Sequence, residues 1–277
     1  MEQDSDFKFI DLEKIIKQKN PRLYFFLPKF LIRLLKKIVH QDEFNNDVNS
    51  LRPNKGIDFL KATLKLFDFK AQVFGIDELP KEGRYIFVSN HPLGGPDGIV
   101  LHCTVNDKFP GSYFMVNDIL MHLPGMESCY LPLNLFGPNS KEYGKKIDEV
   151  FESDSQIIIF PAGLVSRPIG SKIIDLEWKK TFITKAVKYK RDIIPVYIDK
   201  TNSKFFYRVA KFRKFLGIKL NIEMLFLVDE LYKHKHAIIP LYFGKPISYT
   251  TFDNTRKPDE WAAFVKEIVY ELKNHFK

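Results

Sequence analysis

The pattern of apolar runs predicts an α/β fold with a mostly parallel central sheet flanked by helices. Short runs rich in Ile, Val and Phe alternate along the 277-residue chain with longer segments that have helical spacing. Two of the short runs, 85–89 and 156–160, end at turns that contain glycine and proline, residues that stop a strand. Hydrophobic residues make up 45% of the sequence and aromatic residues 14%, which is enough for a large core.

Strands are expected where β-branched and aromatic residues cluster, and helices where apolar residues recur every three or four positions. We assign strands to 71–74, 85–89, 113–116, 129–133, 156–160, 193–198 and 237–243. We assign helices to 57–67, 117–125, 141–151, 178–190, 203–219 and 259–277, with another beginning near residue 98 and one within the segment 21–40, after its aromatic residues. The asparagine-rich segment 41–55 is predicted to be a linker. The chain then divides into an N-terminal amphipathic helical segment (1–56), a main domain (57–250) and a C-terminal helix packed on that domain (251–277).

The N-terminal segment includes a basic amphipathic helix that follows a group of aromatic residues. Its apolar face is formed by Phe30, Leu31, Leu34, Leu35 and Ile38, and lysines and arginines surround the other face. Two interpretations are open. The helix could pack on the domain with a solvated basic face, or it could lie in the headgroup plane of a membrane with its lysines near lipid phosphates.

The balance of 43 basic and 34 acidic residues gives a net charge of +9, which indicates an anionic partner such as nucleic acid, a phosphorylated ligand or a membrane surface. No apolar stretch is long enough to span a bilayer, so any membrane contact is expected to be interfacial. The two cysteines and the acidic start of the chain favour a reducing, cytoplasmic location.

The chemistry is expected in the stretch RYIFVSNHPLGGPDGIVL, residues 84–101. It reads as strand, tight turn and helix, with His91 and Asp97 on either side of the turn. A neutral imidazole can accept a proton from an alcohol near pH 7, and a carboxylate on its other nitrogen fixes the tautomer. The pair could therefore be a general base. Alternatively, Asp97 could only cap the helix and His91 could be an ordinary residue at a strand end.

A second strand end, at Pro161-Ala162-Gly163, is followed by Ser166, Arg167 and a predicted loop rich in proline and glycine that reaches Ser171. The guanidinium of Arg167 suits a phosphate or carboxylate. Lys179 and Lys180 at the next helix could assist it or could be solvated surface residues. No metal site is predicted, because the spacing of His102, Cys103, His122 and Cys129 matches no familiar zinc site. The chain has neither a G-x-S-x-G turn nor a nucleotide-binding glycine loop.

Taken together, three blocks resemble the lysophospholipid (glycerolipid) acyltransferase superfamily over about residues 85–198. They are Asn90-His91-Pro92-Leu93-Gly94-Gly95-Pro96-Asp97, Phe160-Pro161-Ala162-Gly163 and Ile194-Pro195-Val196. The first block has one residue more than the common family spacing, a variant associated with a bacterial subgroup that includes enzymes of amino-acid-containing lipids. In the second block, Ala162 stands where the family usually has glutamate, which puts an ordinary glycerol-phosphate acceptor in doubt.

The resemblance implies an O-acyltransferase. His91, oriented by Asp97, would deprotonate the hydroxyl of a lyso-lipid as it attacks an acyl thioester of acyl carrier protein or coenzyme A. The acceptor would be lysophosphatidic acid or a monoacylated amino-acid lipid, no cofactor would be needed, and backbone N–H groups near Gly94 and Gly95 would stabilise the oxyanion. The residues expected to contact substrates are Asn90, Gly94, Gly95, Phe160, Pro161, Gly163, Ser166, Arg167, Lys179 and Lys180.

The expected location is the cytoplasmic face of the inner membrane, as a peripheral protein, with no nucleic-acid partner. The competing hypothesis is a non-catalytic basic protein that binds an anionic membrane or nucleic acid, for which surface charge would matter and His91 would not.

Overall fold

A computed structural model describes residues 8–117, 120–121, 123, 125–133, 141–215, 217 and 222–276. Within these residues the chain forms a seven-stranded sheet in the order β1-β9-β8-β2-β5-β3-β4. Its strands are β1 (Lys70–Phe74), β2 (Tyr85–Ser89), β3 (Tyr113–Asn117), β4 (Tyr130–Leu133), β5 (Ile157–Ile159), β8 (Asp192–Ile198) and β9 (Ile238–Phe243). All neighbours are parallel except β8 and β9. The predicted α/β class with a mostly parallel sheet is therefore confirmed.

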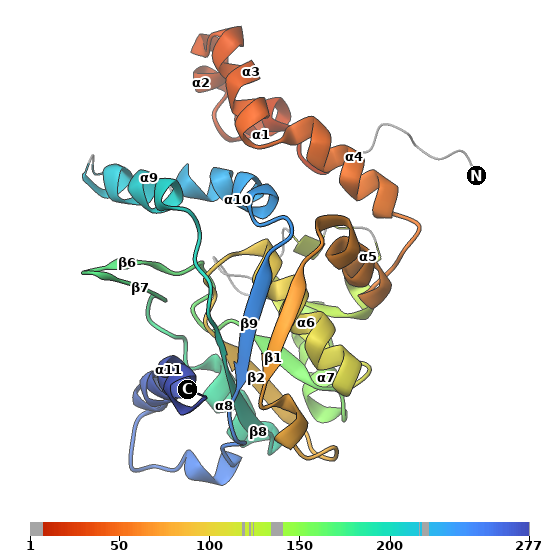
Figure 1. Ribbon diagram of the computed structural model, residues 1–277, viewed down its shortest axis with the longest axis vertical. Helices are drawn as coiled ribbons and strands as arrows, with labels where there is room; N and C mark the ends of the chain where they lie inside the picture. The colour runs from red at the N-terminus through yellow and green to blue at the C-terminus, as the bar shows by residue number, and fades with distance from the viewer. Residues whose placement is uncertain are drawn as a thin grey trace.

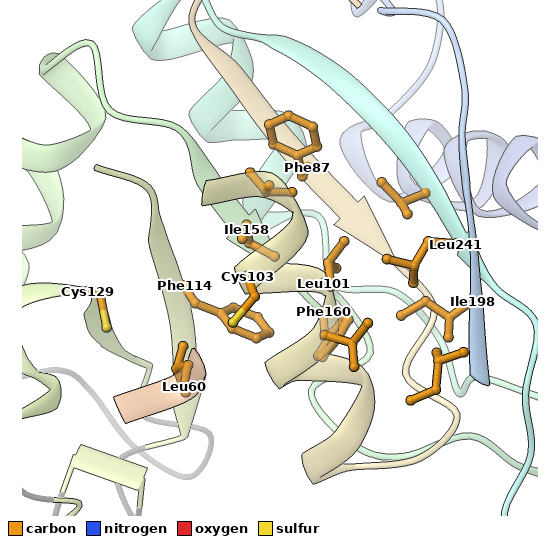
Figure 2. Close-up of a cluster of buried hydrophobic side chains, with 14 of the residues drawn as sticks. Leu60, Phe87, Leu101, Cys103, Phe114, Cys129, Ile158, Phe160, Ile198 and Leu241 are labelled. Carbon is orange, nitrogen blue, oxygen red and sulfur yellow. The ribbon is translucent and has the colours of Figure 1, made fainter. Parts of the chain in front are cut away.

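The sheet is buried because apolar residues face both of its sides. On β2, Phe87 points into one core cluster, and Ile86 and Val88 point into another, as the alternation of strand side chains requires. The first cluster, part of which Figure 2 shows, lies under α5 (Ile57–Phe67) and α6 (Gly95–Lys108). The second cluster includes residues of α7 (Lys141–Glu152), α8 (Thr181–Tyr189) and α11 (Pro258–His275).

Two predicted loops have regular structure. The expected linker 41–55 contains α4 (Gln41–Leu51), in which Gln41 and Asn45 lie on the buried side. Their side-chain oxygens accept hydrogen bonds from the backbone of Leu12 and Ile10. The predicted loop after Ser166 is a hairpin of β6 (Arg167–Ile169) and β7 (Lys172–Ile174). The linker prediction was wrong because the contacts that stabilise α4 come from residues about 30 positions earlier. The loop prediction was wrong because each strand of the hairpin has only three residues, too few to show a strand pattern. The helix predicted at 117–125 includes residues 118, 119, 122 and 124, which lie outside the described ones.

The N-terminal helices form the upper end of the molecule, next to α9 (Lys204–Phe215) and α10 (Leu227–Lys233) (Figure 1). The segment 21–40 contains α2 (Pro21–Phe26), which holds the aromatic residues, and α3 (Lys29–Ile38); Pro28 divides the two, and α1 (Leu12–Lys19) precedes them. Ile32 is buried, but Phe30 and Leu34 of the predicted apolar face are exposed. None of the helices in the described part of the chain is long and apolar enough to cross a membrane.

The side chain of His102 lies completely inside the protein, between α6 and the sheet. Its Nε2 is 3.1 Å from the Ser112 carbonyl oxygen, to which it donates in the neutral form, and its Nδ1 has no hydrogen-bond partner among the described residues. Protonation would place a buried positive charge on the ring, with an Nδ1–H group that has no acceptor among the described residues. Burial accordingly lowers the pKa of His102 from its ordinary value of 6.5 to about 4.

We expect this histidine to make the protein sensitive to acid. Because the unfolded chain takes up the proton near pH 6.5 and the folded chain near pH 4, the stability contribution is complete above pH 6.5 and is lost as the pH falls toward 4. Between pH 7 and pH 4.5 the wild type should lose about 2 kcal/mol more unfolding free energy than His102→Gln. Urea unfolding of both proteins at the two pH values measures this difference. Equal losses would show that His102 is not the responsible group.

Candidate active site

The turn between β2 and α6 brings His91 and Asp97 together. His91 Nδ1 is 3.1 Å from Asp97 Oδ2. The Asp97 side chain is fully buried, whereas that of His91 keeps 16% of its surface exposed. One ring nitrogen of His91 is thus held by a buried carboxylate, and the ring remains accessible from outside.

Asp97 also organises the turn itself. Its Oδ2 accepts hydrogen bonds from the backbone N–H groups of Leu93, at 2.7 Å, and Gly94, at 3.3 Å, and its Oδ1 is 2.8 Å from the Gly98 nitrogen. Gly94 has a φ of 99°, which favours glycine. Asp97 therefore serves the turn and the histidine at once, and the two interpretations of this residue are compatible. The Gly94 N–H points toward Asp97, so this group is not directed at a substrate oxygen.

The second predicted strand end lies beside the first, because β5 pairs with β2 in parallel. The ring of Phe160 stacks on the ring of His91, with centroids 4.1 Å apart and planes inclined by 23°. Farther along the same segment, the Ser166 N–H donates to the His91 carbonyl oxygen at 2.7 Å. The block from Phe160 to Ser166 therefore supports both the side chain and the backbone of His91.

Asp175, which the sequence analysis did not single out, joins these two segments. Its Oδ1 accepts hydrogen bonds from the His91 N–H at 3.2 Å and the Ser166 hydroxyl at 2.5 Å, and its Oδ2 accepts one from Trp178 Nε1 at 2.9 Å. The Tyr270 hydroxyl is 2.7 Å from the Asp175 backbone nitrogen. Asp175 is fully buried, and burial raises the pKa of its carboxyl against the lowering effect of these hydrogen bonds. The only local signal was a carboxylate within the otherwise apolar run Ile173 to Leu176.

Asn90 connects the ends of two neighbouring strands. Its Nδ2 donates to the Ile198 carbonyl oxygen at 2.9 Å, and its Oδ1 accepts from the Ile198 N–H at 2.7 Å. The residue is buried, and both ends of its amide are engaged with the protein. These bonds fix the position from which His91 projects.

Arg167 lies inside the protein. Its Nε is 3.3 Å from Glu223 Oε1, and Glu223 Oε2 is 2.8 Å from Arg213 Nε on α9. The Arg167 Nη1 donates to the Val165 carbonyl oxygen at 2.9 Å, and burial lowers the pKa of its guanidinium. The side chain that the sequence suggested for an anionic substrate is thus held in an internal charge cluster of Arg167, Glu223 and Arg213.

The remaining predicted residues lie around the same strand ends. Lys179 and Lys180 are exposed; the Lys179 N–H donates to the Pro161 carbonyl oxygen at 3.1 Å, and Lys180 Nζ is 2.9 Å from Asp259 Oδ2. Gly163 has a φ of 66° and closes a turn onto Phe160. Gly95 begins α6. Among the residues that the structure describes, no cluster of three or more His, Cys, Asp or Glu side chains could hold a metal ion.

The family model described as "Acyltransferase" matches residues 14–277. The chain belongs to this acyltransferase family. It is similar to two proteins named lyso-glycine lipid O-acyltransferase, one from Bacteroides thetaiotaomicron (48% identical) and one from Phocaeicola vulgatus (45% identical). Each alignment covers 98% of this chain, with 100% of the first relative and 98% of the second. The chain is therefore an enzyme that transfers acyl groups.

Among solved structures, this acyltransferase matches the 1-acyl-sn-glycerophosphate (LPA) acyltransferase PlsC from Thermotoga maritima. The TM-score is 0.48 and the sequence identity is 17%, over 95% of each chain.

The side chain of Ala162 in this acyltransferase is buried in the second core cluster. No carboxylate is therefore present at the position where the superfamily usually has glutamate.

Proposed function

We propose that this enzyme transfers a fatty acyl group from a thioester to the hydroxyl of a lyso-glycine lipid. The identities of 48% and 45% to proteins of that name, over nearly the whole chain, support this acceptor. The His91–Asp97 pair is the structural observation that carries the proposal, because it provides a partly exposed imidazole whose other nitrogen is held by a buried carboxylate.

In the proposed reaction, His91 is neutral with its proton on Nδ1, toward Asp97, so that Nε2 can accept the proton of the acceptor hydroxyl. The hydroxyl oxygen then attacks the thioester carbonyl carbon and forms a tetrahedral oxyanion. As this intermediate collapses, the C–S bond breaks and the thiolate leaves with the proton from the imidazolium. The positive end of the α6 dipole lies at the same turn and favours the negative oxygen.

The proposed acceptor also agrees with the polar groups around the strand ends. An N-acylated glycine carries a carboxylate rather than a phosphate, and the superfamily glutamate is replaced by the buried Ala162. Because Arg167 is paired with Glu223, we assign it a structural role. The exposed Lys179, next to Pro161, is then the basic residue that we propose for contact with an anionic headgroup.

We also propose that the N-terminal segment holds the enzyme on the cytoplasmic face of an anionic membrane. Three phenylalanines of α2 and α3 are more than two-thirds exposed: Phe25 at 83%, Phe26 at 79% and Phe30 at 69%. Exposed basic residues, including Arg22, Lys29 and Arg33, lie between or beside them. Exposed aromatic rings combined with basic residues suit the interface of a lipid bilayer.

The expected result of an acyl-transfer assay is a diacylated glycine lipid. The purified protein should be given lyso-glycine lipid or lysophosphatidic acid as acceptor, with acyl-ACP or acyl-CoA as donor, and the products followed by mass spectrometry. We expect turnover of lyso-glycine lipid to exceed that of lysophosphatidic acid by at least about 10²-fold, because a site that fits one polar headgroup rejects another that leaves its groups unpaired. A preference for lysophosphatidic acid would refute the acceptor, and no turnover with either donor would refute the proposed reaction.

A further inference from the structure

The outer face of α9 is apolar and basic although it is exposed. We name as the α9 face the residues Phe205, Arg208, Lys211, Phe212 and Phe215. Its phenylalanines are 48%, 62% and 84% exposed, in sequence order. At about 100° per residue, the three rings and Arg208 fall within an arc of about 80° around the helix axis. The helix contains no acidic residue.

A rotation of α9 cannot bury these three phenylalanine rings, because the inner face of the helix is already packed against the protein. Phe206, Tyr207 and Ala210 are buried there, and Phe206 and Tyr207 form a core cluster with Val165. Arg213, also buried, is paired through Glu223 with Arg167. The guanidinium of Arg167 in turn lies 5.5 Å from the centroid of the Phe206 ring. The charge cluster therefore fixes α9 with its phenylalanines outward.

The α9 face adjoins the N-terminal helices. A groove of about 840 Å³ between α3 and the α9–α10 layer is lined by Arg33, Leu34 and Lys37 on one side and by Phe205 and Phe226 on the other. The acidic residues of this groove are engaged in part with the protein: both Glu43 and Asp229 contact His40. Figure 1 shows α9 and α10 directly below α2 and α3. The groove therefore brings one exposed phenylalanine of the α9 face, Phe205, to the exposed Leu34 of α3.

We propose that the α9 face is a second lipid-contact surface, whose partner is an anionic bilayer. The proposal rests on the proposed function, since an enzyme that acts on a lyso-lipid needs its site near the lipid surface. The chemistry favours a bilayer over nucleic acid, because adjacent exposed rings gain most from burial among acyl chains while the flanking cations meet lipid phosphates. The link from Arg213 to Arg167 connects this surface to Ser166, which is hydrogen-bonded to Asp175 and His91.

The test is flotation of the full chain with phosphatidylglycerol or phosphatidylcholine vesicles. We expect Phe212→Ser/Phe215→Ser to bind phosphatidylglycerol vesicles at least about tenfold more weakly than the wild type. Arg208→Gln/Lys211→Gln should reduce the preference for phosphatidylglycerol and its dependence on salt. The matched control is Val187→Ser/Ile238→Ser, which removes two half-exposed apolar side chains elsewhere on the surface and should bind like the wild type.

Activity separates this proposal from the proposed function. With lyso-glycine lipid dispersed in detergent, Phe212→Ser/Phe215→Ser should keep wild-type turnover, and with the same lipid in vesicles its turnover should fall by the factor found in flotation. If this variant floats as well as the wild type, the α9 face is not a lipid-contact surface. The proposal is also overturned if the wild type does not bind vesicles but binds RNA in a salt-sensitive way, and the variant loses that RNA binding. If the wild type floats but is inactive in detergent, the proposed function fails and the lipid surface stands.

Discussion

Replacing His91 with alanine should lower kcat by about 10²–10⁴-fold, the range that general base catalysis commonly contributes. The physical reason is that the proposed reaction assigns the hydroxyl proton to the His91 imidazole, which Asp97 holds at this strand end. The measurement is steady-state acyl transfer to lyso-glycine lipid with saturating donor. Because the His91 ring is removed from its stack on Phe160, thermal unfolding should be recorded as well.

The matched control is His236→Ala. His236 is an exposed histidine that also contacts an aspartate, Asp68, with Nδ1 3.0 Å from Oδ2. This control should keep wild-type kcat. Asp97→Asn should reproduce much of the His91→Ala loss, because an amide in this place cannot satisfy the donors at both carboxylate oxygens. A His91→Ala enzyme that is folded and retains its kcat would exclude the proposed base.

Replacing Asp175 with asparagine should lower kcat by about 10–100-fold and leave KM for the lyso-lipid nearly unchanged. The asparagine oxygen can still accept from the His91 N–H and the Ser166 hydroxyl, but its NH₂ group then faces the Trp178 indole N–H, so two donors meet. Relieving that contact must move the segment that holds His91, and small displacements of a catalytic group are costly. Asp175 is in this sense a positioning residue for His91.

The double variant Asp175→Asn/Trp178→Phe distinguishes positioning from simple stabilisation. Removing the indole N–H leaves the asparagine NH₂ without an opposing donor, so the double variant should regain kcat over Asp175→Asn although it loses part of the Trp178 packing in the core. Urea unfolding of all three variants supplies the stability scale. If kcat of Asp175→Asn equals that of the wild type while only its unfolding free energy falls, Asp175 supports the fold and not the histidine.

Much of the site could be predicted because its first half is local. Strand, glycine turn and helix follow one another within the 84–101 stretch. The order of residues in that stretch alone therefore predicts that His91 and Asp97 lie at the same strand end. The run 156–160 predicted its strand and turn in the same way, and its parallel pairing with β2 follows from the alternation of strands and helices. The prediction of a linker at 41–55 needed correction because α4 is stabilised by contacts to residues 10 and 12.

The sequence by itself determined the α/β class, the family resemblance and the His91–Asp97 pair, since these depend on periodicity and on residues close together in the chain. Only the tertiary structure decided the contacts of Asp175 and Arg167. Asp175 is 84 residues from His91, and the partners of Arg167, Glu223 and Arg213, follow more than 40 residues later. The partner of a buried charged side chain is the group that the fold brings next to it. The local sequence around the charged residue does not identify that partner. The same reason explains α9, whose phenylalanines are outward because buried contacts occupy its other face.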